Sequence, residues 1–277
     1  MDKDTYHKIL GLFNTKNYAN YSLAVQLLEG MGLPRINFSR MPHKLHIRFE
    51  HFQRLVDYGW IEFIHQHVRY LVLDNYYSTP SAQITRIPDA VFEFRELTTL
   101  VMHNYGIEEL DERIGELSNL RFLSFKCNNI QKLPSSIGNL VHLKRLSLSH
   151  NKLSEESAFP KEFKNLKALR ELVLTENNIH KVPDIISHLP NLKKLVLIRN
   201  KLTTLPSFLV NLPRLRYLYL DNNKFKTFPE LVFDIPQLQD LSLKYNMIHD
   251  LPDIKKRKGK YLSIHGIRPL KKKIKTE

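Results

Sequence analysis

The segment LRFLSFKCNNI (residues 120–130) returns 23 residues later as LKRLSLSHNKL (residues 143–153). Both segments follow the pattern L-x-x-L-x-L-x-x-N-x-L, which begins again at Leu169, Leu192, Leu215 and Leu238. Weaker copies begin at Val68 and Leu97, where Tyr76 and Tyr105 replace the asparagine. A pattern that recurs at a nearly constant period is the signature of a repeat architecture, so this periodicity decides the fold class.

The second half of each unit also recurs. It reads IQKLPSSIGNL in residues 130–140, and the proline of this segment has a counterpart in most units. These prolines are Pro88, Pro134, Pro160, Pro183, Pro206, Pro229 and Pro252. Because proline fixes φ near the helical value, the Leu-Pro pair is expected to start a short helical turn in each unit.

The L-x-L portion of the pattern predicts a strand whose two leucines point to one side. One such turn cannot bury its leucines alone, but stacked copies bury them in a continuous core. The asparagine after the strand suits a tight turn, and its amide can hydrogen-bond backbone groups that stacking would leave without partners. The leucines, asparagines and prolines are therefore interpreted as structural.

These motifs resemble the leucine-rich repeat family, in the proline-containing short-repeat form of Ras-suppressor-like, Scribble-like and many bacterial proteins. The resemblance covers residues 68–265, as about eight repeats and a degenerate last strand over residues 260–264. It implies an α/β fold: a right-handed solenoid, or horseshoe, with a parallel sheet on its concave face. It also implies that ligands bind to that concave face.

The ends of a solenoid need caps, because each end would otherwise expose apolar surface. Residues 1–67 lack the repeat, and apolar spacing in Tyr21–Leu28 and Pro42–Tyr58 predicts two helices. We expect an N-terminal helical cap, and the alternative is a separate small domain with its own binding role. Three extra residues within 154–159 are expected to bulge from the loop or convex side.

The net charge of +14 is concentrated near the C-terminus. Residues 255–277 contain ten basic residues and one acidic residue, so they carry +9 of the +14. The basic runs are Lys255, Lys256, Arg257 and Lys258, and then Lys271, Lys272 and Lys273, the second within a tail of residues 266–277. Such runs can neutralise the phosphates of nucleic acid or of an anionic membrane, which is one alternative function.

No catalytic motif is found. The sequence has no glycine-rich phosphate loop, G-x-S-x-G or H-E-x-x-H motif, and Cys127 has no patterned His or Asp partner. Five histidines, His43, His46, His51, His65 and His67, lack the convergent ligands of a metal site. We expect no enzyme activity, no cofactor, no metal and no small-molecule substrate.

The sequence also bears on location. No apolar stretch of about 18 residues predicts a transmembrane helix, and the first residues do not resemble a secretory signal. Cys127 is the single cysteine, so no disulfide can form within the chain, which fits a cytoplasmic protein.

The outward strand positions are the candidate binding site. Stacking makes Val173, Val196 and Tyr219 neighbours, and a contiguous apolar patch on an outward face marks an interaction site. The full candidate set is Phe122, Arg145, Glu171, Val173, Lys194, Val196, Ile198, Arg199, Tyr217, Tyr219 and Asp221. The favoured function is a scaffold or adaptor that binds another protein there. A further alternative is a regulatory subunit that docks on a phosphatase or GTPase.

Overall fold

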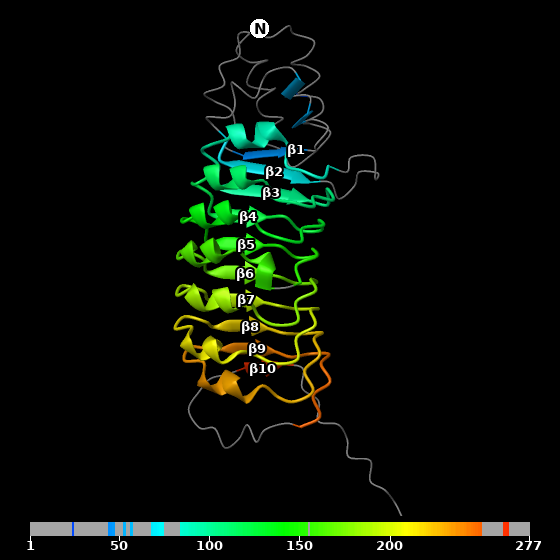
Figure 1. Cartoon of the computed structure of the whole chain (residues 1–277), viewed down its shortest axis with the longest axis vertical. Coiled ribbons are helices and arrows are strands. Elements are labelled where there is room, and N and C mark those ends of the chain that lie inside the picture. Colours follow the sequence, from blue (N-terminus) through cyan, green and yellow to red (C-terminus); the bar gives the residue numbers. More distant parts are fainter. Residues whose placement is uncertain are drawn as a thin grey trace, which may run out of the picture.

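The computed structural model describes residues 24, 44–47, 52–53, 56–57, 68–74, 84–154, 156–250 and 263–265. Within them, ten strands form one parallel sheet in sequence order, stacked along the long axis of the molecule (Figure 1). The strands are β1 (Lys44–Ile47), β2 (Tyr70–Asp74), β3 (Thr99–His103), β4 (Phe122–Ser124), β5 (Arg145–Ser147), β6 (Glu171–Val173), β7 (Lys194–Val196), β8 (Tyr217–Tyr219), β9 (Asp240–Ser242) and β10 (Ser263–His265). This open ladder confirms the predicted solenoid with a parallel sheet.

The register of the sheet follows the repeat. The first leucine of each L-x-L pair lies beside its counterpart in the next strand, as Leu146 lies between Leu123 and Leu172. These leucines are fully buried and belong to a core that runs through the stack. Alternation along each strand therefore sends the other side chains to the opposite face, as predicted.

Short 3-10 helices form the other side of each turn (Figure 1). They are η3 (Asp89–Glu93), η4 (Glu112–Glu116), η5 (Ser135–Asn139), η6 (Glu156–Ala158), η7 (Lys161–Asn165), η8 (Asp184–His188), η9 (Ser207–Asn211) and η10 (Glu230–Asp234). A proline directly precedes six of these described helices, which confirms the predicted role of the Leu-Pro pair. Before η4 the proline is replaced by Asp111, whose carboxylate accepts a hydrogen bond from the backbone N–H of Arg113 at 2.8 Å.

The repeated asparagines connect neighbouring turns. The side-chain oxygen of Asn177 accepts from the backbone N–H of Leu153 at 3.1 Å. Its amide nitrogen donates to the carbonyls of Leu148 at 3.0 Å and of Leu174 at 3.2 Å. Asn128, Asn151, Asn200, Asn223 and Asn246 make equivalent bonds. The expected asparagine ladder is thus present through the described repeats.

The residue before the ladder position has a left-handed backbone in each of seven described turns. These residues are Asn104, Cys127, His150, Glu176, Arg199, Asn222 and Tyr245, with φ between 54° and 64°. For a non-glycine residue this conformation costs on the order of 1 to 2 kcal/mol. Strand pairing and the asparagine ladder hold this left-handed conformation in place. The tight turn predicted at the asparagine is therefore made by the residue before the asparagine.

The N-terminal region departs from the predicted helical cap. Lys44–Ile47 lies within the expected helix Pro42–Tyr58 but forms β1, which pairs with β2. The cause is a cryptic repeat, because Leu45 continues the buried leucine column beside Leu71. The described residues 24, 52–53 and 56–57 are helical, and the ring of Phe52 packs 6.2 Å from that of Phe94. The rest of residues 1–67 lies outside the described residues.

The C-terminal strand keeps the 23-residue period of the repeat, since the structure pairs Ser263 with Asp240 and Ile264 with Leu241. Alignment of Leu262 with the repeat leucines would instead put Tyr261 beside Asp240, two residues too early. Ile264 takes the leucine position and packs against the core. The basic runs 255–258 and 271–273 lie outside the described residues.

The three-residue insertion is packed rather than simply bulged. It forms the extra helix η6, and Ala158 and Phe159 are buried. The carbonyl of Ala158 accepts from the N–H of Leu133 at 2.9 Å, and the ring of Phe159 meets that of Phe163 edge-on at 5.4 Å.

None of the described helices is long and apolar enough to cross a bilayer.

We predict that Asn177→Ala lowers the free energy of unfolding by about 3 kcal/mol. The substitution leaves the buried N–H of Leu153 unsatisfied, at about 1 to 3 kcal/mol. It also removes one bond to the carbonyl of Leu148, at about 0.5 to 1.5 kcal/mol, although that carbonyl still accepts from Asn151. The measurement is urea unfolding followed by circular dichroism. Asn211→Ala is the matched control, because Asn211 is exposed on η9. Equal stability of the two variants would contradict the role of the ladder.

Candidate functional site

We use the term sheet face for the outward side chains of β2 to β9. The strand register places Val173, Val196 and Tyr219 side by side, as predicted. They are less exposed than the sequence suggested, because Val196 is only 5% exposed and Val173 and Tyr219 are half-buried. The apolar side chains therefore form a floor rather than a protruding patch.

A hollow of about 440 Å³ lies on the sheet face over β4 to β8. We call it the sheet hollow. Its lining residues are Phe122, Lys126, Arg145, Leu146, Ser147, Glu171, Val173, Lys194, Val196, Ile198 and Tyr219. Apolar and charged side chains thus share one concave surface, which is the usual composition of a binding site.

Basic side chains outnumber acidic ones in the sheet hollow. Lys194 pairs with Glu171 at 3.1 Å and lies 5.6 Å from the centre of the Tyr219 ring. The guanidinium of Arg145 lies 4.6 Å from the centre of the Phe122 ring. Among the described residues, neither Arg145 nor Lys126 has an ion-pair partner, so the lining keeps a net positive charge.

Three serines on the sheet face occupy equivalent positions on different strands. Ser124 on β4, Ser147 on β5 and Ser242 on β9 are all at most 5% exposed. The Ser124 hydroxyl lies 2.8 Å from Nε2 of His103, and the Ser242 hydroxyl donates to the carboxylate of Asp221. Within the described part of the chain, the buried Ser147 hydroxyl makes no hydrogen bond. Ser147 is the serine of the three that lines the sheet hollow.

Asp221 and Asp240, at the β8–β9 end of the sheet face, each accept a hydrogen bond, but Oδ1 of Asp240 has none within the described structure. Asp221 also accepts from the N–H of Lys244 at 2.6 Å. The hydroxyl of Tyr219 donates to Asp240 at 3.0 Å, and Nε2 of His265 lies 3.3 Å from the same carboxylate. Burial, together with this bond to Asp240, raises the pKa of Tyr219 to about 12. The sheet face is therefore positive over β4 to β7 and negative over β8 and β9.

Comparison with known proteins agrees with this architecture. The family profile described as leucine-rich repeat region matches residues 61–178. A second profile, described as leucine rich repeat, matches residues 156–202, 167–225 and 190–248. Together with the asparagine ladder and the ten-stranded parallel sheet, these matches settle the family. The chain is a leucine-rich repeat protein.

Solved structures support the same fold. One similar structure is a leucine-rich repeat protein of Leptospira interrogans, with a TM-score of 0.57 and 24% sequence identity. The alignment covers 86% of this chain and 67% of that one. At this identity the likeness concerns the fold alone. Comparison with curated protein sequences gives no significant match.

The candidate residues of this leucine-rich repeat protein fall into three groups. Of the predicted set, Phe122, Arg145, Glu171, Val173, Lys194, Val196, Ile198 and Tyr219 line the sheet hollow. Tyr217 and Asp221 lie beside it on and after β8. Arg199 instead lies in the turn after β7, where it pairs with Glu176 at 3.2 Å. Nδ1 of His150 lies 3.1 Å from the same carboxylate.

Three lining residues were not in the favoured set, and one of them, Leu146, is a buried leucine of the repeat. Lys126 and Ser147 both occupy outward positions of the repeat pattern, so their place on the sheet face could be predicted. The importance of Lys126 and Ser147 could not be predicted, because it depends on which neighbouring side chains already have hydrogen-bond or ion-pair partners.

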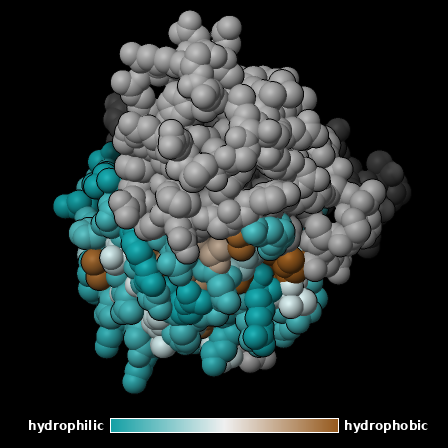
Figure 2. Space-filling view, turned by 90° about the horizontal axis from the view of Figure 1, so that it is seen from above, coloured by the Kyte–Doolittle hydropathy of each residue, from teal (hydrophilic) through white to brown (hydrophobic). Residues whose placement is uncertain are grey.

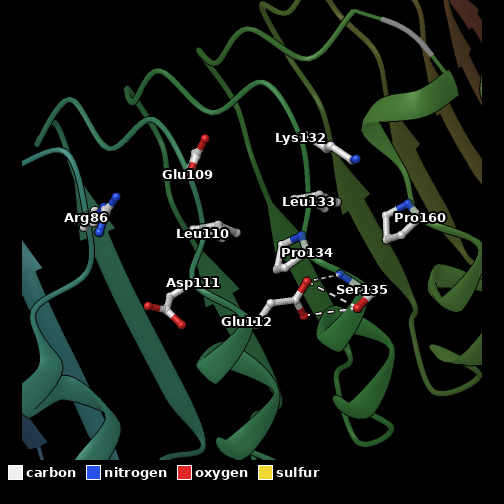
Figure 3. Close-up of a pocket in the computed structure, with 10 residues that line it drawn as sticks. All are labelled: Arg86, Glu109, Leu110, Asp111, Glu112, Lys132, Leu133, Pro134, Ser135 and Pro160. Carbon is white, nitrogen blue, oxygen red and sulfur yellow. Dashed lines mark hydrogen bonds between the residues drawn. The ribbon is translucent and has the colours of Figure 1, made fainter.

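A second hollow, of about 520 Å³, lies among the loops before η4, η5 and η7 (Figure 3). Figure 3 shows Glu112 reaching across to Ser135 on the next turn. The carboxylate of Glu112 accepts from the N–H groups of Ser135 at 3.1 Å and Ser136 at 2.9 Å. Burial by itself would raise the pKa of Glu112, but these hydrogen bonds together have the larger effect. The net result is that the pKa of Glu112 is lowered. Because Glu112 caps η5, this hollow has a structural role.

Large exposed apolar side chains are scattered over the described surface. They are Tyr70, Val141, Tyr245 and Met247, and none of them lines the sheet hollow. Seen from the N-terminal end, the described surface is mainly hydrophilic (Figure 2). Single exposed apolar residues are normal for folded proteins, so these four mark no site by themselves.

No group of three or more potential metal ligands occurs among the described residues. His46 lies on β1, and the other members of the histidine cluster, His43, His51, His65 and His67, lie outside the described residues. Cys127 is partly exposed in the turn after β4, and its N–H donates to the carbonyl of Ser149. As a class, leucine-rich repeats are typically non-enzymatic interaction domains.

We predict that Ser147→Ala leaves the stability of the protein unchanged or raises it. Its hydroxyl is buried without a hydrogen bond within the described structure, and burial of such a group costs free energy. Ser242→Ala is the matched control on the same face and should destabilise by about 1 kcal/mol, because it removes a bond to Asp221. Thermal unfolding measures the stability of the two variants. Equal destabilisation of both would show that the Ser147 hydroxyl has a hydrogen-bond partner in the native protein.

His103 makes stability depend on pH. Burial and the nearby charge of Lys126 lower its pKa from 6.5 to about 4. Between these two values the unfolded chain binds a proton that the native imidazole does not, so stability falls as pH falls. His103→Gln removes this dependence.

We expect the wild type to lose on the order of 2 kcal/mol more than His103→Gln between pH 7 and about pH 4.5. Urea unfolding at the two pH values measures the difference. Parallel losses in both proteins would exclude His103 as the titrating group.

Proposed function

We propose that the sheet face binds another protein and that the chain is a non-enzymatic scaffold or adaptor in the cytoplasm. The proposal rests on the sheet hollow. In this hollow, buried apolar side chains lie beside charged side chains whose positions are fixed by an ion pair or by contact with an aromatic ring. Leucine-rich repeats commonly mediate protein–protein interaction, which supports the same reading.

The dimensions of the sheet face suit a protein partner. Parallel strands lie about 4.8 Å apart, so β4 to β8 span about 20 Å. This span is comparable with the width of a small specific interface. Several side chains there are already restrained, since Lys194 pairs with Glu171 and Tyr219 bonds to Asp240. Restrained side chains lose less conformational entropy when a partner binds.

The test is affinity capture with the double variant Ile198→Ser and Tyr217→Ala. Both side chains are only partly buried on the sheet face, and neither forms an ion pair within the described part of the chain, so their truncation should spare the fold. We expect recovery of specific partners to fall about tenfold or more, as for a hot spot. Circular dichroism checks that the variant is folded.

Val141→Ser is the matched control, because Val141 is an exposed apolar residue after η5, away from the sheet. It should leave partner recovery unchanged. If the double variant captures partners as well as the wild type, the site is elsewhere. If both variants lose them equally, the loss is unspecific.

A further inference from the structure

Five basic residues form a continuous row at the edge of the sheet where the strands begin. Each directly precedes a strand, from β4 to β8, and they are Arg121, Lys144, Arg170, Lys193 and Arg216. The carbonyl of each of the first four accepts a hydrogen bond from the backbone N–H of the next at 2.8 to 2.9 Å, so the five lie on adjacent turns. Neighbouring strands are about 4.8 Å apart, so the row is about 19 Å long. We call it the basic row.

The members of the basic row have no ion-pair partner among the described residues. Arg69 takes the same position before β2, and its guanidinium pairs with the carboxylate of Glu96. Glu171 directly follows Arg170, but its carboxylate pairs with Lys194 on the sheet face at 3.1 Å. Like charges on neighbouring strands repel one another, so the basic row costs free energy until an anion neutralises it.

The residues next to the basic row add positive charge and no negative charge. The four-residue segments that end at its members are 118–121, 141–144, 167–170, 190–193 and 213–216. Besides the row they contain Lys167 and Arg214, and none of their residues is Asp or Glu. Arg121, Arg170 and Arg216 are exposed, and no member of the row lines the sheet hollow. The basic row is therefore a second surface, separate from the proposed protein-binding site.

A line of charges of one sign fits a phosphodiester backbone better than it fits another protein. Each strand of a duplex carries one negative charge for about every 3.4 Å along the axis, without interruption. The basic row therefore spans about five or six nucleotides of one strand. A protein partner would have to present several carboxylates in line across five turns, with no basic residue among them.

The aromatic side chains beside the basic row favour a duplex over a single strand. Proteins that bind single strands stack successive bases on aromatic rings. Two members of the row are directly followed by an aromatic residue, Phe122 after Arg121 and Tyr217 after Arg216. The Phe122 ring is covered by Arg145, whose guanidinium lies 4.6 Å from the ring centre. Tyr217 by itself is no platform for successive bases.

The same surface is poorly suited to a membrane. Helices and segments that lie on a bilayer combine basic residues with apolar side chains that insert among the lipids. Of the large exposed apolar side chains on the described surface, Val141 alone lies in the five segments. The basic row thus offers charge without a means of insertion.

We propose that the basic row binds the phosphate backbone of double-stranded nucleic acid, without regard to base sequence. Its guanidinium and ammonium groups replace counterions along one strand, and release of these ions drives binding. This activity is additional to protein binding by the sheet face and does not depend on it. The sequence suggested binding of nucleic acid for the basic tail, whereas the basic row lies within the folded repeats.

The test is binding of a fluorescein-labelled DNA duplex, about 20 base pairs long, to the full chain over a range of salt concentrations. Fluorescence anisotropy compares the wild type with the triple variant Arg121→Gln, Arg170→Gln and Arg216→Gln. We expect the variant to bind about tenfold more weakly or worse at low salt. The slope of log affinity against log salt should become shallower by about three, one for each lost phosphate contact. A second duplex of unrelated sequence should give the same result.

The matched control is the triple variant Lys152→Gln, Lys224→Gln and Lys226→Gln. It removes the same charge from three exposed positions in the turns that follow β5 and β8, at the opposite edge of the sheet. Its affinity should stay within about threefold of the wild type, because salt screens charges that lie far from the contact. The basic tail is identical in all three proteins and cannot cause a difference between them. Circular dichroism checks that both variants are folded.

Any of three results would overturn the proposal. Equal affinities of the two triple variants would assign binding to net charge or to the basic tail. Tighter binding of the single strand than of the duplex would show that bases are contacted. Phosphatidylserine vesicles or poly-glutamate that bind as tightly as the duplex, with the same dependence on the three arginines, would assign the basic row to a membrane or to an acidic protein.

Discussion

The structure depends on the hydrogen bonds that an asparagine in each of six described turns makes to the turn before it. At the end of each strand the chain leaves the sheet, and backbone groups there would be buried without partners. The amide of Asn177 both donates and accepts, so it satisfies a carbonyl and an N–H of the preceding repeat. Burial of the leucines drives the turns to stack, but many different offsets between neighbouring turns would bury them. The asparagine selects one spacing and one register.

A fixed register has consequences for the opposite face of the sheet. Outward side chains must line up in rows, so each has neighbours above and below it. Crowding in these rows buries residues such as Ser147 and Val196 that would be exposed on an isolated strand. The same rows bring Lys194 to Glu171 and Arg145 to Phe122. The scaffold thus fixes the positions of charges on a surface that is otherwise free to vary.

Such a surface is suited to recognition. Its carboxylates near β8 and β9 accept hydrogen bonds from Ser242, Tyr219 and the N–H of Lys244, whereas Arg145 on β5 has no ion-pair partner among the described residues. This separation of charge along one continuous face supports the proposal of a protein partner. The loop hollow near Glu112 offers no such contrast, because its carboxylate already caps η5.

The sequence by itself determined the repeat, the sheet, the leucine core, the ladder and the outward positions, because each follows from a period that can be counted. It failed where the motif was degenerate: β1 has no ladder asparagine, and in β10 the partly buried Ile264, not Leu262, takes the leucine position. Tertiary structure alone decided that Arg199 leaves the sheet face, that the apolar patch is a floor and that Ser147 lacks a described partner. Those properties depend on contacts between different turns, which no single repeat contains.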